Sequence, residues 1–94
     1  MRVFAQPLRA RVFHLRTQNG DHEVDLIVER ADHRVLAIEV KLATAAKPAD
    51  AKHLNWLAAQ LGDTLIDRVI INTGPFAYRM KDGTAVVPLG LLGP

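Results

Sequence analysis

Cysteine is absent from the 94-residue chain, so neither disulfides nor thiolate metal ligands can form within it. No apolar run is long enough to span a membrane, and the N-terminus lacks the apolar core of a secretory signal. These absences predict a cytoplasmic protein. Aromatic residues make up only 5% of the chain, which argues against a base-stacking surface for single-stranded nucleic acid.

The length and the charge distribution indicate a single domain over residues 1–94 with two differently charged regions. The net charge is only +2, but Arg2, Arg9, Arg11 and Arg16 all precede the first acidic residue, and residues 21–39 hold six carboxylates. A basic arm beside an acidic segment is compatible with a nucleic-acid backbone meeting a metal site. Arginines that serve only solubility explain the same pattern.

Apolar periodicity and turn residues predict that the elements follow one another along the chain as strand-strand-strand-helix-strand-strand. The Asn19-Gly20 pair favours a tight hairpin, and Pro48 and Gly62 mark the two ends of a helix. The expected strands are 11–17, 22–30, 34–42 and 67–73, with a helix over 48–61 and a final strand pair turned at Asp82-Gly83. Tight turns make the first three strands antiparallel, whereas the strand-helix-strand unit makes a parallel pair. The sequence therefore predicts an α/β fold with a mixed sheet of about five strands.

Charged residues interrupt the second and third strands at places where an ordinary strand carries Val or Thr. A three-residue turn at 31–33 sets Val28 opposite Leu36 and Leu26 opposite Ile38, because the apolar faces of the two strands must coincide. The same register sets Asp25 opposite Glu39 and Glu23 opposite Lys41. Directly opposed carboxylates repel each other unless a cation or a proton lies between them. Mg²⁺ or Mn²⁺ is one solution, since hard cations take oxygen ligands, and a solvated sheet edge with an ordinary Glu23–Lys41 ion pair is the other.

The spacing Asp25, thirteen residues, then Glu39-x-Lys41, followed by a helix and a strand, resembles the PD-(D/E)xK nuclease superfamily. The segments "EVDLIVER", "VLAIEVKL", "HLNWLAAQLGD" and "INTGPFAYR" resemble more closely the nuclease-like C-terminal domain of bacterial AAA-type ATPases. The resemblance implies a restriction-endonuclease-like fold. It also implies catalytic roles for Asp25, Glu39 and Lys41, metal ligation by Asp25, Glu39 and the Val40 carbonyl, and an accessory role for Glu23.

The chain departs from that family in two ways. It contains no Gly-rich Lys-Ser/Thr loop, so no ATP site is expected. The segment "MRVFAQPLRA" is long enough for only an incomplete version of the family's N-terminal helix and contains no carboxylate. The sequence thus resembles an abbreviated or detached fragment, for which the ATPase portion or a second copy of the chain is the expected partner.

Two functions remain open on this evidence. The first is a Mg²⁺-dependent nuclease-like domain that acts on or binds nucleic acid, with weak backbone contacts from Arg9, Arg11, Arg16 and Lys52. The second is a catalytically inactive accessory or DNA-binding module with the same fold.

The apolar residues also predict which face of the sheet the helix covers. We expect the 48–61 helix to cover the sheet face that carries Val24, Leu26, Val28, Leu36, Ile38 and Val40. The opposite face would then be left for a second copy or the ATPase portion. Trp56 is expected at the edge of the core, although its side of the helix could instead face nucleic acid. His14, His22, His33 and His53 have no zinc-type spacing.

Overall fold

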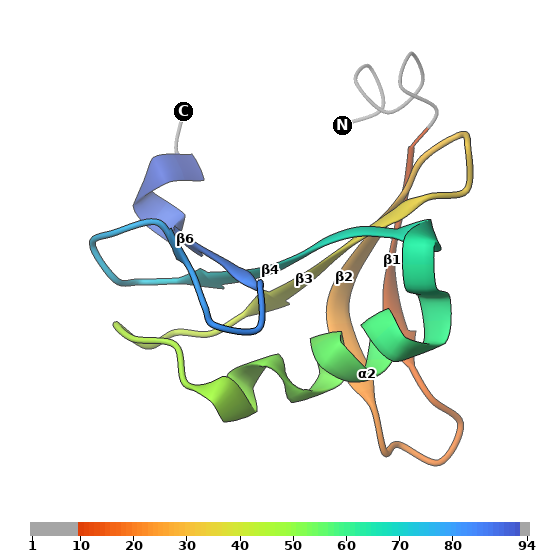
Figure 1. Cartoon of the computed structure of the whole chain (residues 1–94), viewed down its shortest axis with the longest axis horizontal. Coiled ribbons are helices and arrows are strands. Elements are labelled where there is room, and N and C mark those ends of the chain that lie inside the picture. Colours follow the sequence, from red (N-terminus) through yellow and green to blue (C-terminus); the bar gives the residue numbers. More distant parts are fainter. Residues whose placement is uncertain (1–9, 93–94) are drawn as a thin grey trace.

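The computed structural model describes residues 10–92. Six strands and one α-helix make up most of this part of the chain (Figure 1). The strands are β1 (Arg11–Arg16), β2 (Glu23–Glu29), β3 (Val35–Val40), β4 (Leu65–Asn72), β5 (Tyr78–Arg79) and β6 (Ala85–Pro88). The helix is α2 (Lys52–Leu61), preceded by the 3₁₀ turn η1 (Pro48–Ala51) and followed by η2 (Gly62–Thr64), and η3 (Leu89–Leu92) comes last.

All six strands form one sheet in the order β1-β2-β3-β4-β6-β5. The β1–β2, β2–β3 and β5–β6 pairs are antiparallel, whereas β3–β4 and β4–β6 are parallel. The mixed α/β architecture expected from the sequence is therefore confirmed. The sheet has six strands because the two-residue β5 also pairs with β6. The expected incomplete N-terminal helix lies almost wholly outside the described residues.

The helix begins and ends where the sequence indicates. Pro48 occupies the first turn of η1, and the Asp50 carboxylate accepts the Lys47 N–H at 2.8 Å. α2 ends at Leu61, and its C-cap is Gly62, whose φ of 56° favours glycine. The next strand, β4, begins at Leu65, two residues earlier than expected.

A β-bulge in β2 changes which side chains share a face. Phe13 of β1 pairs with Ile27 of β2, and Leu15 pairs with Val24. Between these two pairs the chain advances by two residues in β1 but by three in β2. The extra residue falls at Asp25–Leu26, and it places Val24 and Ile27 on the same face despite their odd spacing.

The expectation about the covered face is wrong. α2 packs on the face that carries Val24 and Ile27 of β2 and Val35 and Ala37 of β3, and these four are buried. Leu54 and Leu57 of α2 fill the space above them, together with Ala51, Ile70 and Val86. Strict alternation hides the bulge and gives the sheet two apolar faces of similar quality. The sequence therefore favoured the wrong one, with these residues under the helix: Leu26, Val28, Leu36, Ile38 and Val40.

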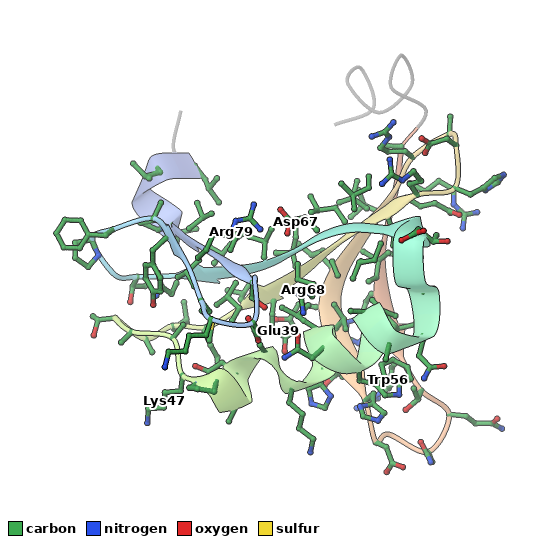
Figure 2. All side chains as sticks on the ribbon, viewed as in Figure 1. Glu39, Lys47, Trp56, Asp67, Arg68 and Arg79 are labelled. Carbon is green, nitrogen blue, oxygen red and sulfur yellow. The ribbon has the colours of Figure 1, made fainter. Side chains whose placement is uncertain are left out.

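The opposite face of the sheet is also apolar, and no helix of residues 10–92 packs across it (Figure 1). We call it the open face, and it consists of Val12, Leu26, Val28, Leu36, Ile38, Val40, Val69, Ile71 and Val87. Val12, Leu26 and Val40 are exposed, and an ion pair of Asp67 with Arg79 lies on the same side (Figure 2). Within residues 10–92, no helix is long and apolar enough to cross a membrane.

Candidate cation site

The β2–β3 ladder ends where the motif carboxylates begin. Leu26↔Ile38 and Val28↔Leu36 pair as the sequence predicts, and the Arg30 N–H donates to the Arg34 carbonyl at 2.9 Å to close the turn. One residue before Leu26, side chains replace the backbone ladder: the Asp25 N–H donates to Glu39 Oε1 (3.0 Å). The Val40 N–H donates to Asp25 Oδ2 (2.8 Å). The two strands therefore form a fork that is bridged by the two carboxylates.

The electrostatic environment of the fork changes the pKa of Glu39. Its pKa is raised above the ordinary value of 4.5, first because burial penalises the charged form. The hydrogen bond from the Asp25 N–H opposes that rise, whereas the nearby charges of Asp25 and Glu23 add to it and Lys41 reduces it. A half-buried carboxylate beside two others favours the approach of a cation or a proton.

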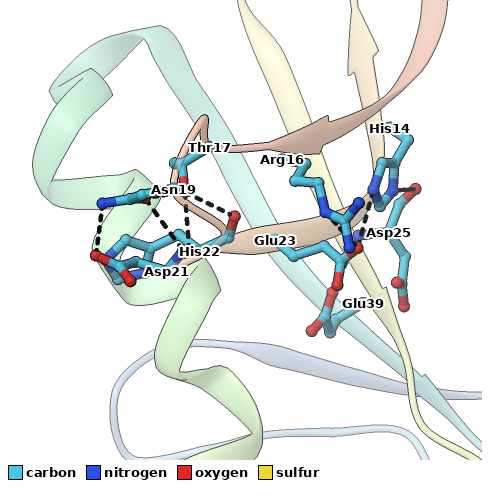
Figure 3. Close-up of polar contacts among 9 residues, drawn as sticks. All are labelled: His14, Arg16, Thr17, Asn19, Asp21, His22, Glu23, Asp25 and Glu39. Atoms are coloured by element: carbon cyan, nitrogen blue, oxygen red, sulfur yellow. Dashed lines mark hydrogen bonds and ion pairs between the residues drawn. The ribbon is translucent and has the colours of Figure 1, made fainter.

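Glu23 lies next to the fork but is held from the other side (Figure 3). Its Oε2 is 3.1 Å from His14 Nε2 and 3.7 Å from Arg16 Nε, both on β1. The expected Glu23–Lys41 pair does not form. The bulge and the fork separate β2 from β3 at this end, so Glu23 pairs with β1 instead.

Lys41 points to the helix rather than to the carboxylates of the fork. Its Nζ lies 3.6 Å from Asp50 Oδ1 at the start of the helical segment, and about half of its side chain is exposed. The motif lysine thus lies on the same side of the sheet as Glu39 but is directed to another partner.

The fork offers oxygen ligands for a hard cation. One oxygen each of Asp25 and Glu39 accepts a backbone N–H, and the second oxygens, Asp25 Oδ1 and Glu39 Oε2, take no part in those two bonds. The Val40 carbonyl lies on the same strand edge as its N–H, because both groups of one strand residue point to one side. Two carboxylate oxygens and a carbonyl suit Mg²⁺, which usually keeps several waters. Among residues 10–92, no group of three or more histidine or acidic side chains could hold a metal ion.

Three of the four residues expected to contact nucleic acid can be located. Arg11 Nη2 lies 3.0 Å from Glu29 Oε1, and Arg16 pairs with Glu23 at 3.7 Å. Lys52 is exposed on α2, and Arg9 lies outside the described residues. The carboxylates of β2 thus offset part of the positive charge of β1.

The structure brings together three side chains that the sequence analysis treated separately. His22 follows the first hairpin turn and His53 lies in the first turn of α2, and their Nδ1 atoms are 3.2 Å apart. The Trp56 ring stacks on His22 with a centroid distance of 4.1 Å and an interplanar angle of 7°. His22 and His53 are 31 residues apart, so no local spacing could have revealed the pair. Trp56 also packs at the edge of the core, as expected.

The fold and the fork define a small mixed α/β domain with bridged carboxylates on adjacent antiparallel strands. Over residues 1–92 the chain matches the family described as Domain of unknown function (DUF4143), and it belongs to that family. This domain is commonly found in AAA-ATPase-associated proteins, in agreement with the resemblance seen in the sequence. No curated protein and no solved structure matches the chain.

Proposed function

We propose that the chain is a PD-(D/E)xK nuclease-like domain that binds Mg²⁺ or Mn²⁺ at Asp25, Glu39 and the Val40 carbonyl and acts on a phosphodiester of nucleic acid. The observation that carries this proposal is the fork. The β2–β3 ladder gives way to carboxylates at the two motif positions, and the pKa of Glu39 is raised by burial and by its acidic neighbours.

The protein's own groups have distinct parts in this reaction. Asp25 and Glu39 supply oxygen ligands, and their hydrogen bonds to the opposite strand fix the distance between the strands. The bound cation would supply activation of a water and stabilisation of the developing phosphoryl charge. Lys41 would leave Asp50 to orient that water, because its Nζ lies 3.6 Å from Asp50 Oδ1 and about half of its side chain is exposed.

The first test is calorimetric titration of the protein with Mg²⁺ and Mn²⁺, compared with Glu39→Gln and with Asp32→Asn, a carboxylate in the 31–33 turn. We expect saturable binding that Glu39→Gln abolishes and Asp32→Asn preserves. Absence of binding to the unsubstituted protein would remove the enzyme from consideration.

The second test is cleavage of labelled duplex DNA, single-stranded DNA and RNA. We expect cation-dependent cleavage that is lost on Lys41→Ala while cation binding remains. Binding to these substrates should weaken as salt rises, because neutralised phosphates release counterions, and Arg16→Ala should reduce the salt slope more than Arg34→Ala, a substitution at the turn.

A second candidate is a catalytically inactive accessory module of an AAA-type ATPase. The open face favours it, because an apolar sheet face needs a second layer in water. The partner that we propose for this face is the ATPase portion, and the family's occurrence in AAA-ATPase-associated proteins supports that choice. Lys41 and Arg11 are each paired with an acidic side chain of this domain. Neither therefore needs a substrate phosphate as its partner, which also favours a domain that does not catalyse.

Sedimentation at micromolar concentration tests this candidate, with the protein alone and with an AAA-type ATPase region added as a separate chain. We expect a monomer that joins the ATPase region, with the complex lost on Ile38→Glu on the open face but kept on Leu91→Glu in η3. A self-dimer that Ile38→Glu dissociates would assign the face to a second copy, and no association of either kind would contradict the module.

A further inference from the structure

The first hairpin and the helix meet at a pair of histidines. His22 Nδ1 and His53 Nδ1 are 3.2 Å apart, and the two rings meet edge to face with centroids 5.4 Å apart. Two nitrogens bound at 2.0–2.1 Å to a tetrahedral ion are separated by about 3.3 Å. The observed separation is close to this value, although it is also an ordinary hydrogen-bond distance.

Both rings are positioned by their surroundings before any ion arrives. The His22 N–H donates to Thr17 Oγ1 (3.0 Å), and the His22 carbonyl accepts the Thr17 N–H (2.9 Å), so the backbone of His22 is fixed in the turn. Trp56 lies flat against the His22 ring, and His53 is carried one turn earlier on the same helix. His22 and His53 are each partly buried, which limits the rotation of their rings.

We propose that His22 and His53 form a two-histidine chelate for a borderline divalent cation of the Zn²⁺, Ni²⁺ or Cu²⁺ class. Neutral imidazole suits these ions, whereas the oxygen ligands of the fork suit Mg²⁺. Water completes the coordination. This site is separate from the fork and does not depend on the proposed nuclease function.

The proton inventory of the pair is consistent with binding. In the metal-free pair, one Nδ1 carries the proton of the 3.2 Å hydrogen bond and the other Nδ1 accepts it. Binding needs both Nδ1 atoms free of protons, so one ring changes tautomer and carries its proton on Nε2 instead. No net proton is released from the neutral pair.

The chain's one tryptophan provides the assay, because Trp56 lies on a proposed ligand. We titrate Cu²⁺ and follow Trp56 fluorescence, since a paramagnetic ion bound beside the indole quenches it. We expect saturable quenching at one ion per chain, reversed by excess Zn²⁺. His22→Gln and His53→Gln should each abolish the saturable phase, whereas His33→Gln, in the exposed 31–33 turn, should preserve it.

Equilibrium dialysis with Zn²⁺ supplies a readout that does not depend on tryptophan. The unsubstituted protein and His33→Gln should bind one equivalent that His53→Gln does not, with circular dichroism used to confirm that each variant is folded. Quenching that does not saturate, or one equivalent of Zn²⁺ retained in the folded His53→Gln variant, would overturn the proposal and leave the pair as a structural hydrogen bond.

Discussion

Replacing the Glu39 carboxylate by an amide should stabilise the metal-free protein at neutral pH. The raised pKa of Glu39 means that the folded state, taken as a whole, favours the neutral side chain. Glu39→Gln keeps a carbonyl oxygen for the Asp25 N–H but removes the charge that burial, Asp25 and Glu23 disfavour.

The pH dependence of this effect has a definite sign. Between the ordinary pKa of 4.5 and the raised folded pKa, the folded state binds more protons than the unfolded state. The stability of the unsubstituted protein therefore falls as pH rises through this window and remains lower above it. The advantage of Glu39→Gln should be absent below the ordinary pKa and complete above the folded one.

Glu39→Ala separates charge from hydrogen bonding. Alanine removes the acceptor of the partly buried Asp25 N–H, and a buried donor left without a partner costs about 1–3 kcal/mol. In a domain of this size, 1 kcal/mol shifts the melting temperature by about 4–8 °C. Glu39→Ala should therefore melt at least several degrees below Glu39→Gln at every pH.

Divalent cations should reverse the order of stability of the unsubstituted protein and Glu39→Gln. Mg²⁺ at a hundredfold excess over its Kd stabilises a folded protein by about 2.7 kcal/mol, and Glu39→Gln should gain none of it. Thermal melts from pH 4 to 8, with and without Mg²⁺, measure all of these effects. If Glu39→Gln is less stable than the unsubstituted protein at pH 7 without metal, the carboxylate stabilises the fork and our account of it is refuted.

Three further substitutions test the packing and the remaining electrostatics by thermal or urea melts. Gly74→Ala should destabilise the fold by about 1–3 kcal/mol, because its Cβ would overlap the backbone carbonyl oxygen of Thr44. Gly90→Ala, with open space around it, should be nearly neutral, and equal effects would contradict this packing. Leu54→Ala, at a fully buried position, should cost about 2–5 kcal/mol, and a smaller loss would mean that α2 does not anchor the core. The Arg79 guanidinium lowers the pKa of Asp67, so the Asp67–Arg79 pair stabilises the fold above the ordinary pKa of Asp67 and loses this effect as pH falls through the lowered pKa. Asp67→Asn should remove this loss of stability at acidic pH, and an unchanged dependence of stability on pH would contradict the prediction.

The order of the elements and the β2–β3 register could be predicted from the sequence. Local signals carry that information: a three-residue turn, matching apolar faces, Pro48 at the start of the helix and Gly62 at its end. The same register predicts that Asp25 and Glu39 lie close together. The fork confirms this, because each carboxylate accepts a backbone N–H from the other strand.

The face of the sheet that α2 covers, and the partners of the long side chains, depend on tertiary packing and could not be predicted from the sequence. The bulge at Asp25–Leu26 puts Val24 and Ile27 on one face, and no periodic pattern shows a bulge in advance. Lys41 reaches Asp50, and His22 reaches His53 and Trp56, because the crossover brings α2 back over the sheet. Such contacts join residues far apart in the chain, so they depend on how the elements pack and not on the local sequence that forms each element.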